Sequence, residues 1–345
     1  STGIPKGVLK SHGAVISFIE AYVSHFGFCE DEVIGNQTPF FFDASAKDIY
    51  LMHKTGASME ILPTEFFAMP PSLINYMNER KVTLISWVPS ALSVVVQLNT
   101  FSAVLPETLK YVLFVGEVMP VKHLNKWREA LPDLRYVNLY GATELAGISC
   151  LYEVDRPFEN DENLPMGKPL ENCRIYLTSG GKIITEPGKV GEIFIVSDAL
   201  ADCYYGDEEK TAATFVTMDF GDGPVRCLKS GDLAQYDENG DLVFAARSDF
   251  QIKHMGHRIE LGEIETAAGA LDHVQRCACL YNEKKSRIVL FCQLEEGSGL
   301  TGNEIKAMLA GKLSSYMVPN RVNILDELPY NANNKIDRQK LKEML

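Results

Sequence analysis

The chain has 345 residues, 46% of them hydrophobic, and a formal net charge of −13 at neutral pH. This length exceeds one typical hydrophobic core, so we expect roughly two folded domains. The negative charge argues against nucleic acid or an anionic membrane surface as the main partner, because both require a basic face, and no apolar run is long enough for membrane insertion. An anionic substrate would therefore have to meet lysine and arginine side chains gathered at one site.

Between residues 1 and 170 the sequence alternates helical periodicity with short apolar runs. This alternation predicts an α/β fold, in which crossover helices join the strands of a parallel sheet. The predicted helices include residues 13–26, 71–79 and 89–98, and the predicted strands include residues 82–87, 111–115 and 136–139.

The pattern changes after residue 170. Residues 171–248 contain short strands separated by glycine and aspartate, which predicts a small β-rich subdomain. Residues 249–345 predict a small α+β domain, with a hairpin near 250–260, a helix from 261, two strands, a helix over 302–313 and a basic tail. We therefore predict an N-terminal domain over residues 1–248 and a mobile C-terminal domain over residues 249–345, with no long linker between them.

The eight cysteines form no Cys-x-x-Cys pair and no Cys/His cluster with zinc spacing. This pattern is typical of reduced, mostly buried thiols, and it predicts a cytoplasmic protein.

Residues 1–7, Ser-Thr-Gly-Ile-Pro-Lys-Gly, place small hydroxyls and glycines beside one lysine. Backbone N–H groups, hydroxyls and an ammonium can together surround phosphate oxygens. The pattern of a Walker loop is absent, which disfavours a P-loop kinase, and a plain surface turn is the alternative. Because the chain opens inside this motif without an initiator Met, we expect an upstream segment to be missing.

Asp43 follows an aromatic run and precedes a predicted helix. A carboxylate in such a place needs a cationic partner if it is buried, or else it serves as a helix N-cap. Lys47 follows one helical turn later. It either faces the same pocket or pairs with Asp43 or Asp48 on a solvated face.

Residues 138–144 follow a predicted strand and end in Thr143 and Glu144. A hydroxyl beside a carboxylate suits an α-phosphate and a Mg²⁺ ion, and a plain turn is the alternative. Asp232 follows Ser-Gly in what we predict to be a tight turn between two strands. Lys335 lies in the basic tail, where its charge suits a reaction that develops negative charge on phosphate.

Taken together, these motifs resemble those of the adenylate-forming (AMP-binding) superfamily, and most closely its amino-acid-activating branch. That branch contains the adenylation domains of peptide synthetases and the D-alanine:carrier-protein ligases. The chain departs from the family pattern at Ala142, Ser230 and Asn334, where Pro, Thr and Gly are usual.

The resemblance implies that ATP and an amino acid react to an aminoacyl adenylate, whose acyl group passes to the thiol of a phosphopantetheinyl carrier protein. It implies rotation of the C-terminal domain about a hinge at Asp249 between the two half-reactions. The implied catalytic residues are Thr143, Glu144, Lys253 and Lys335, with Glu144 as the Mg²⁺ ligand. The implied ATP-binding residues are Ser1, Thr2, Gly3, Lys6, Gly116, Glu117, Asn138, Tyr140, Gly141, Asp232, Phe244 and Arg247. The implied amino-acid pocket contains Asp43, Ala44, Lys47, Val115 and Gly147.

The identity of the amino acid is a separate hypothesis. Val115 and Lys47 depart from the D-alanine ligases, and an ammonium in the pocket would favour glutamate or aspartate as substrate. No carrier-like segment follows Leu345, so we expect the carrier protein to act in trans.

Two alternatives stay open. An acyl-CoA or aryl-CoA ligase would share every nucleotide motif, but Asp43 argues against it. The chain could also be an inactive fragment of such an enzyme, because part of the N-terminal region is missing.

Overall fold

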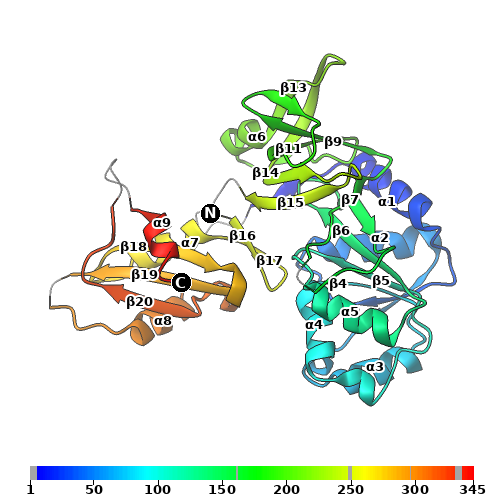
Figure 1. Cartoon of the computed structure of the whole chain (residues 1–345), viewed down its shortest axis with the longest axis horizontal. Coiled ribbons are helices and arrows are strands. Elements are labelled where there is room, and N and C mark those ends of the chain that lie inside the picture. Colours follow the sequence, from blue (N-terminus) through cyan, green and yellow to red (C-terminus); the bar gives the residue numbers. More distant parts are fainter. Residues whose placement is uncertain (1–5, 161, 248–250, 296, 331–335) are drawn as a thin grey trace. The chain divides into compact units, whose positions relative to one another are not determined.

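The structure is a computed structural model that describes residues 6–160, 162–247, 251–295, 297–330 and 336–345, without the side chains of residues 246, 247, 251 and 258. The described residues form two compact units, residues 6–247 and residues 251–345 (Figure 1). Among the described residues, no helix has both the length and the apolar character needed to cross a bilayer.

The first unit is built on a seven-stranded sheet with strand order β3-β2-β4-β5-β6-β7-β8. Its first five strands are parallel, which confirms the predicted α/β fold, while β7 and β8 are antiparallel additions. In chain order, the strands are β2 (Val33–Asn36), β3 (Ser58–Ile61), β4 (Leu84–Trp87), β5 (Tyr111–Val115), β6 (Arg135–Gly141), β7 (Ile148–Glu153) and β8 (Lys168–Pro169).

Helices cover both faces of this sheet (Figure 1). Because successive side chains of a strand point to opposite faces, Val112 and Phe114 of β5 pack in one core while Leu113 packs in the other. The first core is closed by α3 (Pro70–Glu79), α4 (Pro89–Gln97) and α5 (Val121–Ala130), and the second by α1 (His12–Phe26) and α2 (Ala44–Thr55). Two short 3₁₀ helices, η1 (Thr64–Ala68) and η2 (Thr100–Ser102), complete this layer.

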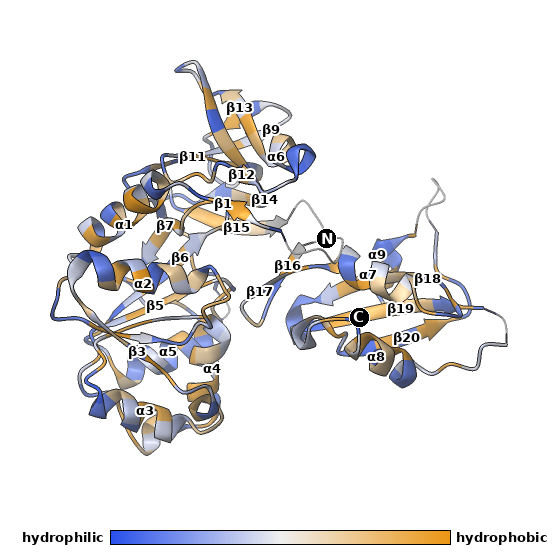
Figure 2. Cartoon of the chain, turned by 180° about the vertical axis from the view of Figure 1, so that it is seen from behind, coloured by the Kyte–Doolittle hydropathy of each residue, from blue (hydrophilic) through white to orange (hydrophobic). Residues whose placement is uncertain are grey.

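A six-stranded antiparallel sheet forms the β-rich part of the first unit. It contains β9 (Cys173–Ser179), β10 (Lys182–Ile184), β11 (Gly191–Ser197), β13 (Phe215–Asp219), β14 (Pro224–Tyr236) and β15 (Leu242–Arg247). A separate two-stranded ladder pairs β1 (Val8–Leu9) with β12 (Cys203–Tyr204), and α6 (Glu208–Thr214) follows it. In Figure 2 the strands of this region include marked hydrophobic stretches, in keeping with their contribution to the buried core.

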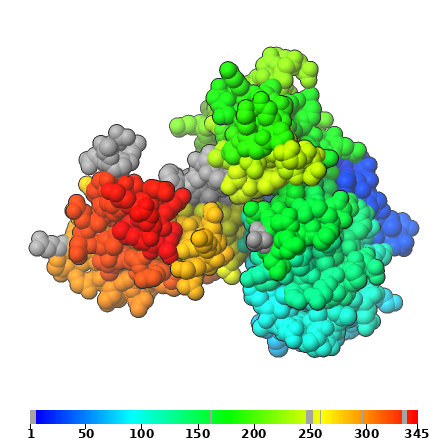
Figure 3. Space-filling view, viewed as in Figure 1, coloured from blue at the N-terminus to red at the C-terminus, as the bar shows by residue number. Residues whose placement is uncertain are grey.

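The second unit opens with the predicted hairpin, β16 (Gln251–His254) and β17 (His257–Glu260), followed by α7 (Leu261–Gly269). Its three-stranded sheet has the order β18-β19-β20, with β18 (Val274–Asn282), β19 (Arg287–Leu294) and β20 (Arg321–Leu325). The remaining elements are η3 (Glu283–Lys285), α8 (Gly302–Ala310), η4 (Ser315–Met317) and α9 (Arg338–Lys342). Red atoms of the C-terminal residues are visible on the surface of this unit (Figure 3).

Candidate functional site

Several candidate residues of the first unit lie at or after the carboxyl ends of strands in its parallel sheet. Asp43 follows β2, Gly116 and Glu117 follow β5, and Tyr140 lies at the end of β6. Since these strands run in parallel, their carboxyl ends meet at the same edge. The topology therefore gathers segments that lie about a hundred residues apart in the sequence.

The connection between β6 and β7 carries Thr143 and Glu144. The register of the two strands shifts between Tyr140 and Gly141. A Cβ atom built on Gly141 would lie 2.1 Å from the carbonyl oxygen of Gly147, so the backbones approach more closely than any other residue would permit. Thr143 is partly exposed, whereas the side chain of Glu144 is only 4% exposed.

Glu144 is held by partners from a distant segment. The phenol of Tyr204 donates a hydrogen bond to Oε1 of Glu144. The backbone N–H of Ala201 donates to the backbone carbonyl oxygen of Glu144 at 2.8 Å. The carboxylate is therefore buried with hydrogen-bonding support, as a buried charge requires.

Lys10 is a site residue that sequence reasoning missed. Burial lowers the pKa of Lys10 below its ordinary value, while the charges of Asp43 and Glu144 act in the opposite direction. The ammonium thus lies within electrostatic reach of both carboxylates. The available signal was a lysine directly after the apolar pair Val8–Leu9, at the end of the phosphate motif.

Asp43 occupies the N-cap position of α2, but its side chain makes no capping hydrogen bond. It is exposed at the edge of the sheet. The N-cap interpretation is therefore confirmed for the position of Asp43 but not for its carboxylate, because a capping side chain must accept a hydrogen bond from the first turn.

Lys47 is only 3% exposed, and its Nζ lies 2.7 Å from Oδ1 of Asp48. Oδ2 of Asp48 accepts a hydrogen bond from Nδ2 of Asn36 at 3.0 Å. Pairing with Asp48 was one of the two interpretations left open, but the pair lies in the interior and not on a solvated face. The Lys47 charge is already balanced inside the protein.

Asp232 and Tyr140 meet between the two sheets of the first unit. The phenol of Tyr140 donates a hydrogen bond to Oδ2 of Asp232, and both side chains are buried. Burial, followed by the charge of Asp232, raises the pKa of Tyr140 well above its ordinary value. Tyr140 therefore stays protonated and orients the Asp232 carboxylate.

The predicted turn before Asp232 is wrong, because residues 230–232 lie inside the continuous strand β14. Gly231 has a φ of 75°, and the ladder with β11 is irregular opposite this point. The hydroxyl of Ser230 donates to the carbonyl oxygen of Ile193 at 3.0 Å and accepts from the N–H of Asp232 at 3.1 Å. Side-chain hydrogen bonds thus maintain the strand through a glycine bulge.

Other predicted nucleotide residues have structural partners. Nδ2 of Asn138 donates to the carbonyl oxygen of Pro165 at 2.7 Å. Oε2 of Glu117 accepts from the backbone N–H of Ser90 at 2.9 Å, which caps the first turn of α4, and Gly116 before it has a φ of 98°. Phe244 is half-buried against the core that contains Tyr140.

The remaining predicted residues divide into three groups. Val115 and Ala44 are half-buried at the sheet edge, Gly147 lies against the ring of Phe18, and Lys6 is exposed. Lys253 lies in β16 of the second unit, and the backbone of Arg247 pairs with that of Asp232. Ser1, Thr2, Gly3, Asp249 and Lys335 lie outside the described residues.

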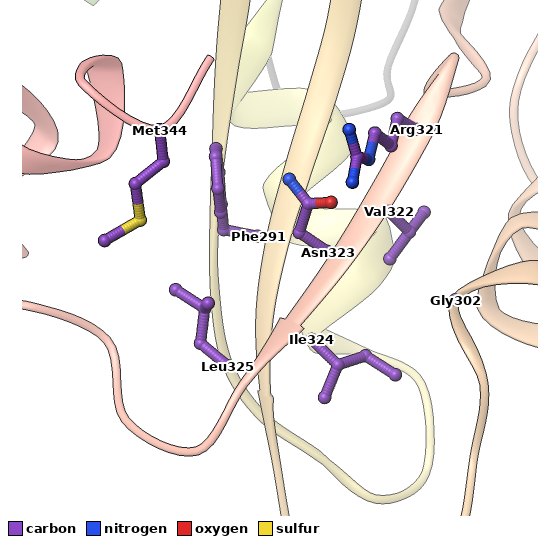
Figure 4. A pocket seen from close by; sticks show the side chains of 8 residues that line it. All are labelled: Phe291, Gly302, Arg321, Val322, Asn323, Ile324, Leu325 and Met344. Atoms are coloured by element: carbon purple, nitrogen blue, oxygen red, sulfur yellow. The ribbon is translucent and has the colours of Figure 1, made fainter.

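A hollow of about 420 Å³ lies in the second unit, along β20 and beside Gly302 and Met344 (Figure 4). Apolar side chains of Phe291 and Leu325 line it together with Arg321. None of the predicted site residues lines it.

Comparison with known proteins identifies the family of the chain. Residues 1–205 match the family described as AMP-binding enzyme, and residues 263–335 match the AMP-binding enzyme C-terminal domain. An L-proline--[L-prolyl-carrier protein] ligase from Streptomyces coelicolor is 34% identical over 99% of this chain and 64% of its own length. A D-alanine--D-alanyl carrier protein ligase from Bacillus cytotoxicus is 31% identical over 99% of this chain and 68% of its own. A plipastatin synthase protein from Bacillus subtilis is 30% identical over 99% of this chain, which spans only 9% of that much longer relative.

Solved structures agree with this assignment. The crystal structure of IdnL1 superposes with a TM-score of 0.85 and 30% identity, covering 94% of this chain and 67% of that one. The Vibrio cholerae adenylation domain AlmE, in complex with glycyl-adenosine-5'-phosphate, shares the fold with a TM-score of 0.84 at 22% identity, over 99% of this chain and 64% of its own. The chain thus belongs to the AMP-binding enzyme family.

Proposed function

We propose that this protein activates an amino acid with ATP as an aminoacyl adenylate and transfers the acyl group to the phosphopantetheinyl thiol of a carrier protein. The observation that carries the proposal is Asp43, an exposed carboxylate with no capping role at the sheet edge that also bears Glu144. A carboxylate there suits the α-ammonium of an amino acid. The names of the proline and D-alanine ligases support the same reaction.

In the proposed first step, Asp43 orients the amino acid so that a carboxylate oxygen attacks the α-phosphorus of ATP. The bond from that phosphorus to the pyrophosphate oxygen breaks, and holding both reactants in line lowers the barrier. Tyr140 is proposed to contact the adenine, Asp232 the ribose hydroxyls, and Lys6 and Thr143 the phosphates. In the second step a thiol attacks the acyl carbon and AMP leaves.

The residues at Glu144 fit a Mg²⁺ ion that arrives with ATP. Mg²⁺ is usually held by one or two carboxylates together with substrate phosphates and water, and not by an all-protein cage. Among the described residues no three His, Cys, Asp or Glu side chains gather into such a cage, and Glu144 supplies a single carboxylate, with Thr143 preceding it in the sequence. When bound, Mg²⁺ would neutralise charge on the phosphates.

The roles of the C-terminal residues are proposed from motif positions alone. Lys335 would neutralise charge during adenylation, and Lys253 would serve thioester formation. The domain over residues 249–345 would turn about Asp249 between these steps, because one site can hardly exclude water and also admit a thiol.

We further propose that the substrate has an uncharged side chain. The acidic-substrate hypothesis rested on an unpaired Lys47 ammonium, but Asp48 lies 2.7 Å from its Nζ. A neutralised lysine gives no electrostatic reason to prefer glutamate or aspartate.

An ATP–pyrophosphate exchange screen over L- and D-amino acids and amine-free carboxylic acids tests the proposal. Exchange is expected with one or a few uncharged amino acids, and Asp43→Ala is expected to reduce it by roughly 100-fold, the effect of about 2.7 kcal/mol in transition-state binding. Asp31→Ala, at an exposed carboxylate before β2, is the matched control. Exchange with amine-free acids would identify an acyl-CoA or aryl-CoA ligase instead, and exchange with glutamate would overturn the uncharged substrate.

A further inference from the structure

Residues 199–205, here called the bridging segment, contact two separate parts of the site. On one side, the N–H of Ala201 donates to the carbonyl oxygen of Glu144 at 2.8 Å. The N–H of Ala146 donates to the carbonyl oxygen of Ala199 at 3.0 Å. These bonds attach the segment to the loop that carries Thr143 and Glu144.

On its other side, the bridging segment pairs with the last residue of the phosphate motif, Gly7, and with Leu9 just after it. The N–H of Tyr205 donates to the carbonyl oxygen of Gly7 at 2.8 Å, and the N–H of Asp202 donates to that of Leu9, also at 2.8 Å. A Cβ atom on Gly7 would lie 3.2 Å from Cβ of Tyr205, so the two backbones are closely packed. One short segment thus connects the backbone at Gly7 and Leu9 to the Glu144 loop.

Tyr204 is the second-to-last residue of the bridging segment and is only 4% exposed. Its phenol donates a hydrogen bond to Oε1 of Glu144. The ring is held by contacts with Phe215, at a centroid distance of 5.9 Å, and with the Lys210 ammonium, 5.1 Å from its centroid. Its backbone N–H donates to Oγ1 of Thr211 at 3.0 Å. The position of the phenol is therefore fixed by its ring and by its backbone.

A carboxylate that binds a cation must present its oxygens in a defined direction. Hydrogen bonds from neighbouring groups commonly supply that direction, and their removal typically weakens metal affinity about 10- to 100-fold. Tyr204 makes this kind of contact with Glu144, and its strand β12 also pairs with β1, which follows the phosphate motif. The phenol can therefore hold the carboxylate in the direction that a bound Mg²⁺ ion would require.

We propose that Tyr204 is a positioning residue for Mg²⁺·ATP, which orients the carboxylate of Glu144. This inference rests on the proposed role of Glu144 as the Mg²⁺ ligand. It assigns no contact between Tyr204 and the nucleotide or the metal.

The test compares the affinity of a non-hydrolysable ATP analogue with and without saturating Mg²⁺, measured by isothermal titration calorimetry. In Tyr204→Phe the gain in affinity that Mg²⁺ produces is expected to fall about 10-fold or more, while the metal-free affinity stays close to that of the wild type. The KM for Mg²⁺·ATP in pyrophosphate exchange should rise, and the KM for the amino acid should not change.

Tyr136→Phe is the matched control. Tyr136 is 3% exposed, and its phenol donates to the carbonyl oxygens of Trp127 and Leu131 at 2.9 and 2.8 Å. It therefore loses a buried phenolic hydrogen bond that serves the core alone, and the Mg²⁺ gain should persist. A Glu144→Gln variant should abolish the gain, and adding Tyr204→Phe to it should cause no further loss.

An unchanged Mg²⁺ gain in Tyr204→Phe would overturn the inference, as would an equal loss in Tyr136→Phe. So would a wild-type protein that shows no gain at all. The calorimetric measurement needs no amino acid, so its result is independent of the exchange screen. A chain that loses its Mg²⁺ gain in Tyr204→Phe but exchanges with no amino acid would retain this inference and lose the proposed function.

Discussion

Lys47 and Asp48 are neighbours on α2, where adjacent side chains ordinarily diverge around the helix. Both are nevertheless buried and in contact, because the amide of Asn36 at the end of β2 holds the other oxygen of Asp48. A buried ion pair of this kind is costly to break at one partner, since the other charge is then left unpaired.

Replacing Lys47 with Met should lower the free energy of unfolding by about 3–5 kcal/mol. The double variant Lys47→Met/Asp48→Asn should recover a large part of this loss, because it leaves no unpaired charge in the interior. Urea unfolding of the two variants measures the difference. Equal stability of the single and double variants would contradict a buried charge pair.

Lys10 makes a prediction with a defined pH dependence. Its pKa is lowered in the folded protein, so protonated Lys10 is less favourable in the folded than in the unfolded state. This cost is complete below the lowered pKa and disappears as the pH rises to the ordinary value of 10.5. Lys10→Met should therefore be more stable than the wild type at pH 7, and the advantage should shrink as the pH approaches about 10.

Urea midpoints at both pH values provide the measurement for Lys10→Met. Lys182→Met, at an exposed position of β10, is the matched control. A Lys10→Met advantage that stays constant with pH would show that its origin is packing and not charge.

At the scale of elements, the connection between β6 and β7 depends on two glycines that approach each other. Gly147 was predicted to lie in the amino-acid pocket, and the structure adds a packing requirement. A Cβ atom there would lie 2.3 Å from the ring of Phe18, which is fully buried on α1.

Gly147→Ala should therefore destabilise the protein by about 1–3 kcal/mol, because the core around Phe18 would be overpacked. Gly13→Ala is the matched control, since Gly13 lies in α1 and its Cβ would come no closer than 3.8 Å to a neighbour. That change should stabilise the helix by about 0.5–1 kcal/mol. Thermal unfolding measures the stability of both variants. A Gly147→Ala variant as stable as the wild type would refute the packing argument.

The sequence predicted elements well where the signal is local. The apolar run of β5 has side chains for two cores, so it could be recognised as a strand covered on both faces. The strand β20 was missed because its residues are mostly exposed or half-buried and show no clean alternation. The bulge at Gly231 was taken for a turn because Ser-Gly-Asp is also typical of turns.

Contacts between distant residues could not be predicted in the same way. Glu144 and Tyr204 are 60 residues apart, and their hydrogen bond depends on the pairing of β1 with β12. Asp48 was among the alternatives as the partner of Lys47, but a pair buried in the interior was not. Its burial is set by how α2 packs on the sheet. Lys10 was missed for the same reason, because its nearness to Asp43 and Glu144 depends on contacts between distant residues.

For the whole molecule, the thiols differ widely in accessibility. Cys29 is exposed, whereas burial raises the pKa of Cys227 and Cys277 to about 11 and that of Cys292 to about 12. Since the thiolate is the reactive form, these three thiols should react slowly.

Iodoacetamide at pH 8 should therefore modify Cys29 first in the folded protein, and Cys227, Cys277 and Cys292 much more slowly. Peptide mass spectrometry at short reaction times locates the label. A Cys29→Ser variant should remove the fast phase, and rapid labelling of Cys292 in the folded protein would contradict its burial.

Each hydrophobic core of the described residues draws its side chains from one unit, either residues 6–247 or residues 251–345. A replacement of either unit therefore leaves the interior packing of the other as it was. This gives protein engineers a natural crossover point at residues 248 and 249. Chimeras that join one unit of this chain to the counterpart of a 31%-identical relative should fold without a redesigned core.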